Sequence, residues 1–389
     1  MLLGFKTELK INNKQRSALA QHAGTARHAW NWGLALTKQI LDHNKANPDN
    51  KIKFPTAIDL HKWLVALVKP SNSWYYSCSK CAPQWALRHL SQSWKRAFKK
   101  IAKPPRFKKK GKSDSFTLDG AIKIEHQKIK IPKIGWLKTH EKLPYGCQPK
   151  SVTVSRKANR WFISFKIEVE PYQNCLSEVV GVDLGIKTLA TLSSGVTFKG
   201  AKSYKKYEAK LSRLQYLNRH KEKGSQNWQK AQKKIAKLHF KIANIRKDTL
   251  HKFTTYLAKN HSQIVIEDLN VSGMLANRKL AKAVQDMGFY EFRRQLEYKC
   301  QLYGSKLIIA DRWFASSKTC SNCGYKKEKL SLSERVFNCE NCGVEIERDL
   351  NAAINLKSLA ASFVVSACGV VSADTATMKQ ENNSKFTHE

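Results

Sequence analysis

The stretch NCENCGVEIERDLNAAINL, residues 338–356, joins a metal-binding signal to a helix signal. Cys339 and Cys342 form a C-x-x-C pair, and Asp349 follows seven residues after the second cysteine. Beyond Asp349, the residues LNAAINLKSLAA place apolar side chains at the spacing of an amphipathic helix. An acidic residue therefore stands where a metal-binding segment gives way to a helix, in a chain that contains few acids.

A second C-x-x-C pair precedes this stretch, so that the chain has four cysteines in a regular pattern. Fifteen residues separate the two pairs, and a glycine follows each pair, as tight zinc-knuckle turns favour. Four thiolates complete the tetrahedral shell that Zn2+ prefers and leave no position for water, so we expect one structural zinc ion. The predicted ligands are Cys320, Cys323, Cys339 and Cys342.

The charge of the chain indicates a nucleic-acid partner. Its 389 residues include 70 Lys and Arg against 30 Asp and Glu, which gives a formal net charge of +40. Self-repulsion of this size is tolerated when a polyanion is the normal partner. The N-terminus lacks the apolar region of a secretion signal, and no apolar run is long enough to span a bilayer. We therefore expect a cytoplasmic protein that associates with the nucleoid through DNA and keeps its cysteines reduced.

The first part of the chain predicts one strand, then helices, then a group of strands. Residues 5–11 alternate apolar and polar side chains, and residues 14–100 have helical spacing. Residues 93–112 hold ten basic residues and no acidic one. Residues 106–172 return to strand-like patterns with Gly and Pro between them. This order predicts a small β-barrel that is split by a helical insertion.

From Val179 onward, apolar strands alternate with basic helices. The run VVGVDLGIKTLATLSSG predicts a buried strand, a turn at Gly185 and a hairpin. Residues 201–250 are helical and hold fifteen Lys or Arg against three acids, so their solvated face is basic enough to lie along phosphates. Two short strands follow, in HSQIVIEDLN and KLIIADRWF, and the polar tail from about Val371 is predicted to be disordered.

Three carboxylates each stand at the end or the beginning of an apolar element in this part of the chain. Asp183 follows VVGV, Glu267 follows IVI, and Asp349 precedes the last helix. Each has an ordinary explanation when it is taken alone, since acids open turns, end strands and cap helices. Together they match an RNase H-like sheet, which brings such positions to one edge. Two Mg2+ ions held there by oxygen ligands can clamp a phosphodiester. We therefore expect a metal-dependent nuclease.

Four separated motifs resemble those of one known family, in the same order. GVDLGIKTLATLSSG, IVIEDLNVSGM, SSKTCSNCG and CENCGVEIERDLNAAINL are similar to the RuvC-like and zinc-ribbon motifs of TnpB, the transposon-encoded OrfB proteins. RHAWNWGL near the N-terminus also resembles an early helix of that family. The resemblance implies an RNA-guided DNA endonuclease related to the type V CRISPR effectors, with Asp183, Glu267 and Asp349 as its catalytic metal ligands.

The resemblance also implies a multidomain α/β fold. An RNase H-like (RuvC) nuclease domain would carry the inserted zinc ribbon, and a split β-barrel, called the wedge, would carry a helical recognition lobe. Asp349 would lie close behind Cys342 because the chain re-enters the nuclease domain there. The expected boundaries are 1–20 and 106–172 for the wedge, 21–105 for the helical lobe, 176–315 and 344–371 for the nuclease domain with its basic segment 204–250, 316–343 for the ribbon, and 372–389 for a disordered tail.

The implied partners are a structured guide RNA, a double-stranded DNA target beside a short motif, and the displaced single strand, without a membrane or a small-molecule substrate. The implied cofactors are a pair of Mg2+ ions, which Mn2+ can replace, and one Zn2+. The basic segments are expected to line the nucleic-acid channel, represented by Lys99, Lys100, Lys108, Lys109, Lys110, Lys205, Lys206, Lys233 and Lys234. Two alternatives stay open: a nuclease-dead RNA-guided DNA-binding protein, and a basic zinc-ribbon DNA-binding protein associated with transposition.

Overall fold

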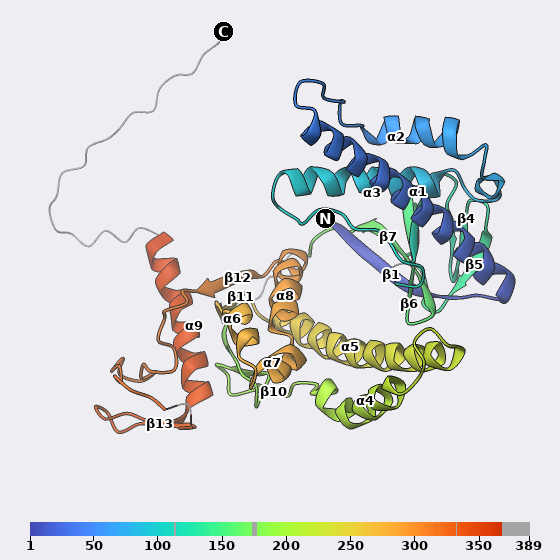
Figure 1. Ribbon diagram of the computed structural model, residues 1–389. Helices are drawn as coiled ribbons and strands as arrows, with labels where there is room; N and C mark the ends of the chain where they lie inside the picture. Colours follow the sequence, from blue (N-terminus) through green and yellow to red (C-terminus); the bar gives the residue numbers. More distant parts are fainter. Residues whose placement is uncertain (113, 173–176, 332, 368–389) are drawn as a thin grey trace, which may run out of the picture. The chain divides into compact units, whose positions relative to one another are not determined.

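The computed structural model describes residues 1–112, 114–172, 177–331 and 333–367, so the predicted disordered tail lies outside the described residues. The chain divides into two compact units, residues 1–170 with 207–243, and residues 171–206 with 244–389. Helices α4 (Ser203–Arg219) and α5 (Gln226–Asn260) contribute residues to both units (Figure 1). Within the described ranges, no helix has the length and apolar character needed to cross a membrane.

The first unit contains a seven-stranded antiparallel sheet with the order β2-β6-β7-β1-β5-β4-β3. Its strands are β1 (Leu2–Lys10), β2 (Ser115–Asp119), β3 (Lys123–Glu125), β4 (Lys128–Ile131), β5 (Gly135–Thr139), β6 (Ser151–Lys157) and β7 (Arg160–Glu168). The central strand β1 pairs with β7 over most of its length and with β5 only at Leu9 and Lys10. Among the described residues the edge strands β2 and β3 do not pair with each other, so a closed barrel stays a prediction.

Helices are inserted between β1 and β2, as the sequence predicts. They are α1 (Asn13–Ala46), α2 (Ala57–Trp63), the π-helix η1 (Leu64–Val68), the 3-10 helix η2 (Ser73–Ser77) and α3 (Cys81–Phe98). Asn12 starts α1, because its side chain accepts a hydrogen bond from the Gln15 backbone N–H, 2.8 Å away. Helices α1 and α3 pack tightly at Gly33, where a β-carbon would lie 2.8 Å from Leu87 Cδ2.

The second unit contains a five-stranded sheet with the order β10-β9-β8-β11-β12. Its strands are β8 (Val179–Leu184), β9 (Ala190–Leu192), β10 (Thr197–Phe198), β11 (Gln263–Glu267) and β12 (Lys306–Ala310). Strands β8, β11 and β12 run parallel, whereas β8, β9 and β10 form antiparallel pairs. The other elements of this unit are α6 (Val271–Ala276), α7 (Ala281–Met287), α8 (Phe289–Tyr303), the hairpin β13 (Val336–Asn338) and β14 (Glu345–Glu347), and α9 (Arg348–Ala367).

Helices cover both faces of the five-stranded sheet, which explains why its parallel strands read as continuous apolar runs. Val180, Val182, Ile264 and Ile266 lie in one core with residues of α5 and α8. Val265 points to the opposite face and packs in a separate core with residues of α9. The alternation along β8 and β11 therefore decides which side chains meet α9.

Gly181 lets α9 lie directly on β8. A β-carbon at Gly181 would be 2.5 Å from the backbone nitrogen of Lys357 and closer still to the carbonyl oxygen of Ala353. We expect Gly181→Ala to lower the free energy of unfolding by about 3 kcal/mol, since backbone atoms cannot rotate away as a side chain can. Denaturant unfolding measures this loss. Gly4→Ala is the control, because nothing lies within 4 Å of a β-carbon at Gly4; equal stability of the two variants would contradict the close packing.

Candidate active site

Two of the three predicted catalytic carboxylates stand side by side at the end of the parallel strands. In the register of β8 and β11, Ile266 pairs with Val182, so Glu267 and Asp183 are the next residues of the two strands. Neighbouring strands are about 4.8 Å apart. Because side chains alternate, Asp183 shares the face of Gly181 and Glu267 shares the face of Val265, which is the face that α9 covers.

The third carboxylate reaches the same edge from α9. Asp349 is the second residue of this helix, which packs on β8 and β11. The negative charges of Glu267 and Asp349 are both close enough to affect the pKa of Asp183. Burial and these two negative charges raise the pKa of Asp183 from 3.8 to about 8, and Arg348 opposes the rise. The structure thus brings together the three side chains that the sequence pattern selects.

Two neighbours orient the other carboxylates. The hydroxyl of Ser316, a buried residue, donates a hydrogen bond to Glu267 Oε1. Arg348 Nη2 lies 3.6 Å from Asp349 Oδ1, and both side chains are largely shielded from solvent. Neither Ser316 nor Arg348 was predicted from the sequence as part of this site, since a serine before the cysteines carries no signal of its own.

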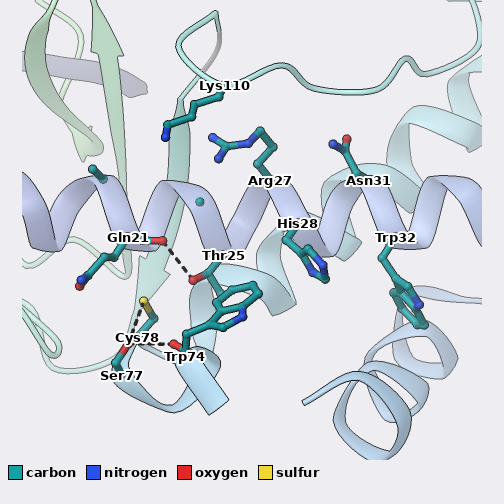
Figure 2. Close-up of a pocket in the computed structure, with 12 residues that line it drawn as sticks. Gln21, Thr25, Arg27, His28, Asn31, Trp32, Trp74, Ser77, Cys78 and Lys110 are labelled. Carbon is teal, nitrogen blue, oxygen red and sulfur yellow. Dashed lines mark hydrogen bonds between the residues drawn. The ribbon is translucent and has the colours of Figure 1, made fainter. Parts of the chain in front are cut away.

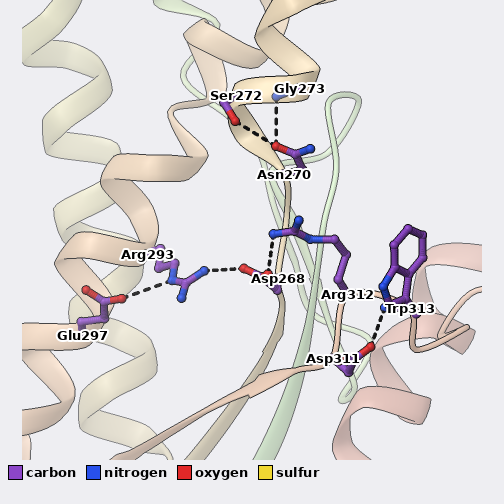
Figure 3. A network of polar contacts seen from close by, with 9 residues as sticks. All are labelled: Asp268, Asn270, Ser272, Gly273, Arg293, Glu297, Asp311, Arg312 and Trp313. Atoms are coloured by element: carbon purple, nitrogen blue, oxygen red, sulfur yellow. Dashed lines mark hydrogen bonds and ion pairs between the residues drawn. The ribbon is translucent and has the colours of Figure 1, made fainter.

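Asp268, beside Glu267, is the centre of a charged network on the opposite side of β11 (Figure 3). Its carboxylate accepts hydrogen bonds from Arg293 Nη1 at 2.6 Å and from Arg312 Nη2 at 2.7 Å. These two bonds, that of Arg293 first, hold the pKa of Asp268 below its ordinary value. The same residues line a cavity of about 580 Å3 that also contacts Glu267. The network therefore holds the residue that follows Glu267 to α8 through Arg293 and to the segment after β12 through Arg312.

The four predicted zinc ligands converge in the second unit. Their sulfur atoms all lie within 4.8 Å of one another. The Sγ atoms of Cys320 and Cys342 are 3.7 Å apart, and those of Cys323 and Cys339 are 3.5 Å apart. Bonds of about 2.3 Å in a tetrahedron place sulfurs roughly 3.8 Å apart, so the arrangement fits a closed four-sulfur zinc site.

Each cysteine pair forms the same turn, and the turns supply N–H groups to the sulfurs. The glycines that follow the pairs, Gly324 and Gly343, have φ angles of 76° and 69°, a region that glycine adopts without strain. The backbone N–H of Tyr325 and the Asn341 amide lower the pKa of the Cys323 thiol to about 6. These donors favour the thiolate of Cys323, the form that binds zinc, whereas burial raises the pKa of the Cys339 thiol to about 11.

Two buried asparagines of α9 tie the ribbon to the active site. Asn351 accepts a hydrogen bond from Ser321 N at 2.9 Å and donates one to Thr319 O at 2.7 Å. Asn355 Nδ2 donates to the carbonyl oxygens of Ser316 and Thr319, both at 2.7 Å. The segment that enters the ribbon is thus held to the helix that carries Asp349. Asparagines four residues apart in an apolar helix stripe are a signal that could have indicated this contact.

We expect Asn355→Leu to loosen this segment and to reduce DNA cleavage. The substitution leaves the carbonyl oxygen of Ser316 without its donor, which costs about 1–3 kcal/mol, and leaves Thr319 O with only the donor from Asn351. The measurements are thermal unfolding and the cleavage rate, with Asn50→Leu at an exposed asparagine of the first unit as the control. A variant with wild-type stability and rate would show that the asparagine contacts do not support the site.

The lysines chosen as representatives of the basic segments differ in their surroundings. The Nζ of Lys108 lies 3.9 Å from the centre of the Trp30 ring, and burial lowers the pKa of this lysine. Lys205 stands in the first turn of α4, where its backbone N–H donates to Asp286. The side chains exposed to solvent are those of Lys99, Lys100, Lys109, Lys110, Lys205, Lys206, Lys233 and Lys234.

Lys110 lines a cavity of about 840 Å3 in the first unit (Figure 2). The side chains that surround it come mainly from α1, with Trp74 from η2 and Lys110 from the loop before β2. Arg27 on its wall is paired with Asp114 at 3.0 Å, and His28 contacts Tyr75 Oη at 2.7 Å. Its wall combines aromatic rings with cationic groups, and no motif in the sequence indicated it.

Three family models match successive parts of the chain. The OrfB_IS605 model, described as "Probable transposase", matches residues 162–278. The model described as "Cas12f1-like, TNB domain" matches residues 289–356, which contain the four cysteines and Asp349. The HTH_OrfB_IS605 model, described as "Helix-turn-helix domain", matches residues 1–46, which here form β1 and the single helix α1.

Relatives match the chain over most of its length. InsQ of Escherichia coli K12, named as a candidate RNA-guided DNA endonuclease, is 36% identical over 401 residues, which cover 98% of this chain and 97% of InsQ. A protein of Streptomyces pristinaespiralis with the same description is 40% identical over 297 residues, 74% of this chain and 72% of that protein. The solved Cas12f1-sgRNA-target DNA complex contains a chain with the same fold, with a TM-score of 0.52, 16% identity, and coverage of 88% of this chain and 83% of that chain.

Proposed function

This chain belongs to the TnpB (IS605 OrfB) family, and from that membership we propose that it is an RNA-guided endonuclease that cuts double-stranded DNA. One observation carries the proposal. Asp183, Glu267 and Asp349 meet at one sheet edge in a chain that matches InsQ from end to end. A binding protein without nuclease activity has no use for three gathered carboxylates whose burial and charge raise the pKa of Asp183.

The five-stranded sheet is the proposed RNase H-like (RuvC) nuclease domain, with the zinc ribbon inserted before α9. Its strand order, three antiparallel strands followed by two parallel ones, and the helix that covers it support this assignment. The seven-stranded sheet of the first unit and its inserted helices are the proposed wedge and recognition lobe. Residues 207–243 of the basic helices group with this unit, although they were predicted to accompany the nuclease domain.

The three carboxylates are the proposed ligands of a divalent cation such as Mg2+ or Mn2+. They offer oxygen donors only, and a cation would neutralise the charges of Glu267 and Asp349 that, after burial, raise the pKa of Asp183. A metal bound there supplies Lewis-acid stabilisation and a more acidic bound water. Asp183, Glu267 and Asp349 would hold it, Ser316 keeps the Glu267 carboxylate oriented, and Arg348 balances part of the negative charge around Asp349.

The positive net charge of the chain supports nucleic acids as its partners. Exposed lysines are frequent after α3 and along α4 and α5, and a chain of net charge +40 needs a polyanion. In the proposed function a guide RNA occupies part of this surface, base pairing reads the target sequence, and the protein reads backbone shape and a short adjacent motif. The zinc ribbon, with Zn2+ bound by the four cysteines, helps to load single-stranded DNA at the nuclease site.

The test is to express the chain together with the DNA that flanks its gene, purify it in high salt, and sequence the RNA that stays bound. We expect one discrete RNA with a constant structured part and an end that matches sequence beside the gene or a CRISPR spacer. A heterogeneous sample of cellular RNA would refute guided targeting and leave a basic metal-dependent nuclease or binding protein.

A further inference from the structure

Trp313 presents its indole ring to solvent next to the candidate active site. Its side chain is 87% exposed, whereas Trp74 and Trp63, the next most exposed tryptophans of the described residues, are at 41% and 37%. Figure 3 shows the ring beside the Arg312 side chain, at the end of the Asp268 network. A ring that stays exposed contributes no burial energy to folding, and at this position it is accessible to a ligand.

Hydrogen bonds fix the backbone around Trp313, so the exposed position of the ring is set by a structured segment. The Trp313 N–H donates to Asp311 Oδ1 at 2.8 Å, and the Phe314 N–H donates to Asp311 O at 3.1 Å. On one side, Arg312 is bonded to Asp268; on the other, Phe314 packs in the core beneath α9. Two residues further on, Ser316 bonds to Glu267. Both flanks of the ring are therefore anchored to the strand end that carries Glu267.

The register of the sheet places Trp313 close to the reacting phosphate. Glu267 on β11 pairs with Ala310 on β12, and Trp313 is three residues beyond Ala310. Three residues reach at most about 11 Å, and the strands are about 4.8 Å apart. The Trp313 backbone is thus within roughly 15 Å of that of Glu267. This distance corresponds to a few nucleotides of a DNA strand that crosses the carboxylate cluster.

We propose that Trp313 is a stacking platform for a base of single-stranded DNA, and that it holds the strand at the nuclease site within a few nucleotides of the bond to be cut. The proposal rests on the proposed function. A base is a better ligand than a phosphate here, because Arg312 is already paired with Asp268 and because Asp311 lies beside the ring. Every base has a flat π-face, so such a platform holds DNA of any sequence, as guided cleavage requires.

The test compares Trp313→Phe, Trp313→Leu and Trp313→Ala in the full-length, zinc-containing chain. Single-stranded DNA carrying 2-aminopurine reports stacking through quenched fluorescence, at a salt concentration that suppresses non-specific binding and in the Asp183→Asn background, where the DNA stays uncut. We expect quenching with Trp313 and with Phe, and loss of it with Leu and Ala. The affinity for the oligonucleotide should fall about 5- to 100-fold in the Leu and Ala variants, since one stacked base contributes that much.

The Phe and Leu variants separate stacking from mere apolarity or folding, because both fill space but only Phe offers a ring. Tyr145→Ala, at an exposed aromatic of the first unit, is the second control and should leave the quenching unchanged. Quenching by Leu equal to that by Trp would overturn the proposal. If the wild type cuts DNA with a guide and Trp313→Ala cuts equally well, the stacking proposal alone fails. If no variant cuts but quenching follows the ring, the platform stands and the proposed nuclease function fails.

Discussion

We expect Asp183→Asn to abolish DNA cleavage by the guide-loaded protein, with a rate loss of about 10^3-fold or more. The asparagine keeps the shape of the side chain but removes one of the three negative charges that hold the divalent metal, and the metal contributes several kcal/mol to the transition state. Binding of the guide RNA and of the DNA target should stay near wild type. A cleavage assay and a filter-binding assay on the same preparation measure both; a variant that cuts at the wild-type rate would show that Asp183 has been misassigned.

Although Asp183→Asn is expected to remove activity, it should raise the stability of the metal-free protein at high pH. The folded-state pKa of Asp183 is raised from 3.8 to about 8, so between these values the folded protein binds more protons than the unfolded chain. The contribution of this group to stability therefore falls as pH rises from about 4 to 8. In buffer without Mg2+ at pH 8.5, Asp183→Asn should melt at a higher temperature than wild type, and the difference should disappear near pH 4. Mg2+ should raise the melting temperature of the wild type only.

Cys339→Ser removes zinc from the protein and unfolds the ribbon. Among the residues of this segment that the structure describes, Phe337 is the one large side chain that is completely buried, with Leu330, Val344 and Ile346 partly buried around it, so the apolar core is too small to fold the ribbon without metal. We expect zinc content to fall from one ion per chain toward zero. Limited proteolysis should then cut within residues 320–347, and cleavage of DNA should drop because Ser316 no longer holds Glu267.

The matched control is Cys147→Ser in the first unit, a half-buried cysteine outside the cluster. It should keep the full zinc content, the protease resistance of the ribbon and the cleavage rate. Unchanged zinc stoichiometry in Cys339→Ser would contradict the assignment of the four cysteines. Loss of zinc without any change in cleavage would instead contradict the coupling of the ribbon to Glu267 through Ser316, Asn351 and Asn355.

The sequence was most informative where local chemistry and spacing coincide. The apolar runs before Asp183 and Glu267 predicted two apolar strands, and the structure pairs those strands in parallel so that the two acids are neighbours. The spacing of the cysteine pairs predicted a cluster that the structure contains. The strand before α1, the helical insertion and the later strands of the first unit are also as predicted.

Contacts that depend on long-range packing could not be predicted in this way. The role of Gly181 arises only because α9, about 170 residues later, lies on it. Lys108 is predicted to line the nucleic-acid channel, and its contact with the Trp30 ring is visible only in the fold. Trp313 stood in an apolar stretch that was taken as part of a strand, whereas β12 ends at Ala310 and leaves the ring in solvent. Gly181 and Lys108 thus contact residues that are distant in sequence, which no local pattern indicates.

The central claim is that an RNA directs cutting at the Asp183–Glu267–Asp349 site, and the direct measurement is to change the guide. The protein is purified with its RNA, the guide end of that RNA is replaced by a new sequence, and a plasmid that carries the matching target is incubated with Mg2+. The account predicts that the cut moves to the new target and disappears in Asp183→Asn. A cut that stays in place when the guide changes, or that survives in Asp183→Asn, would contradict it.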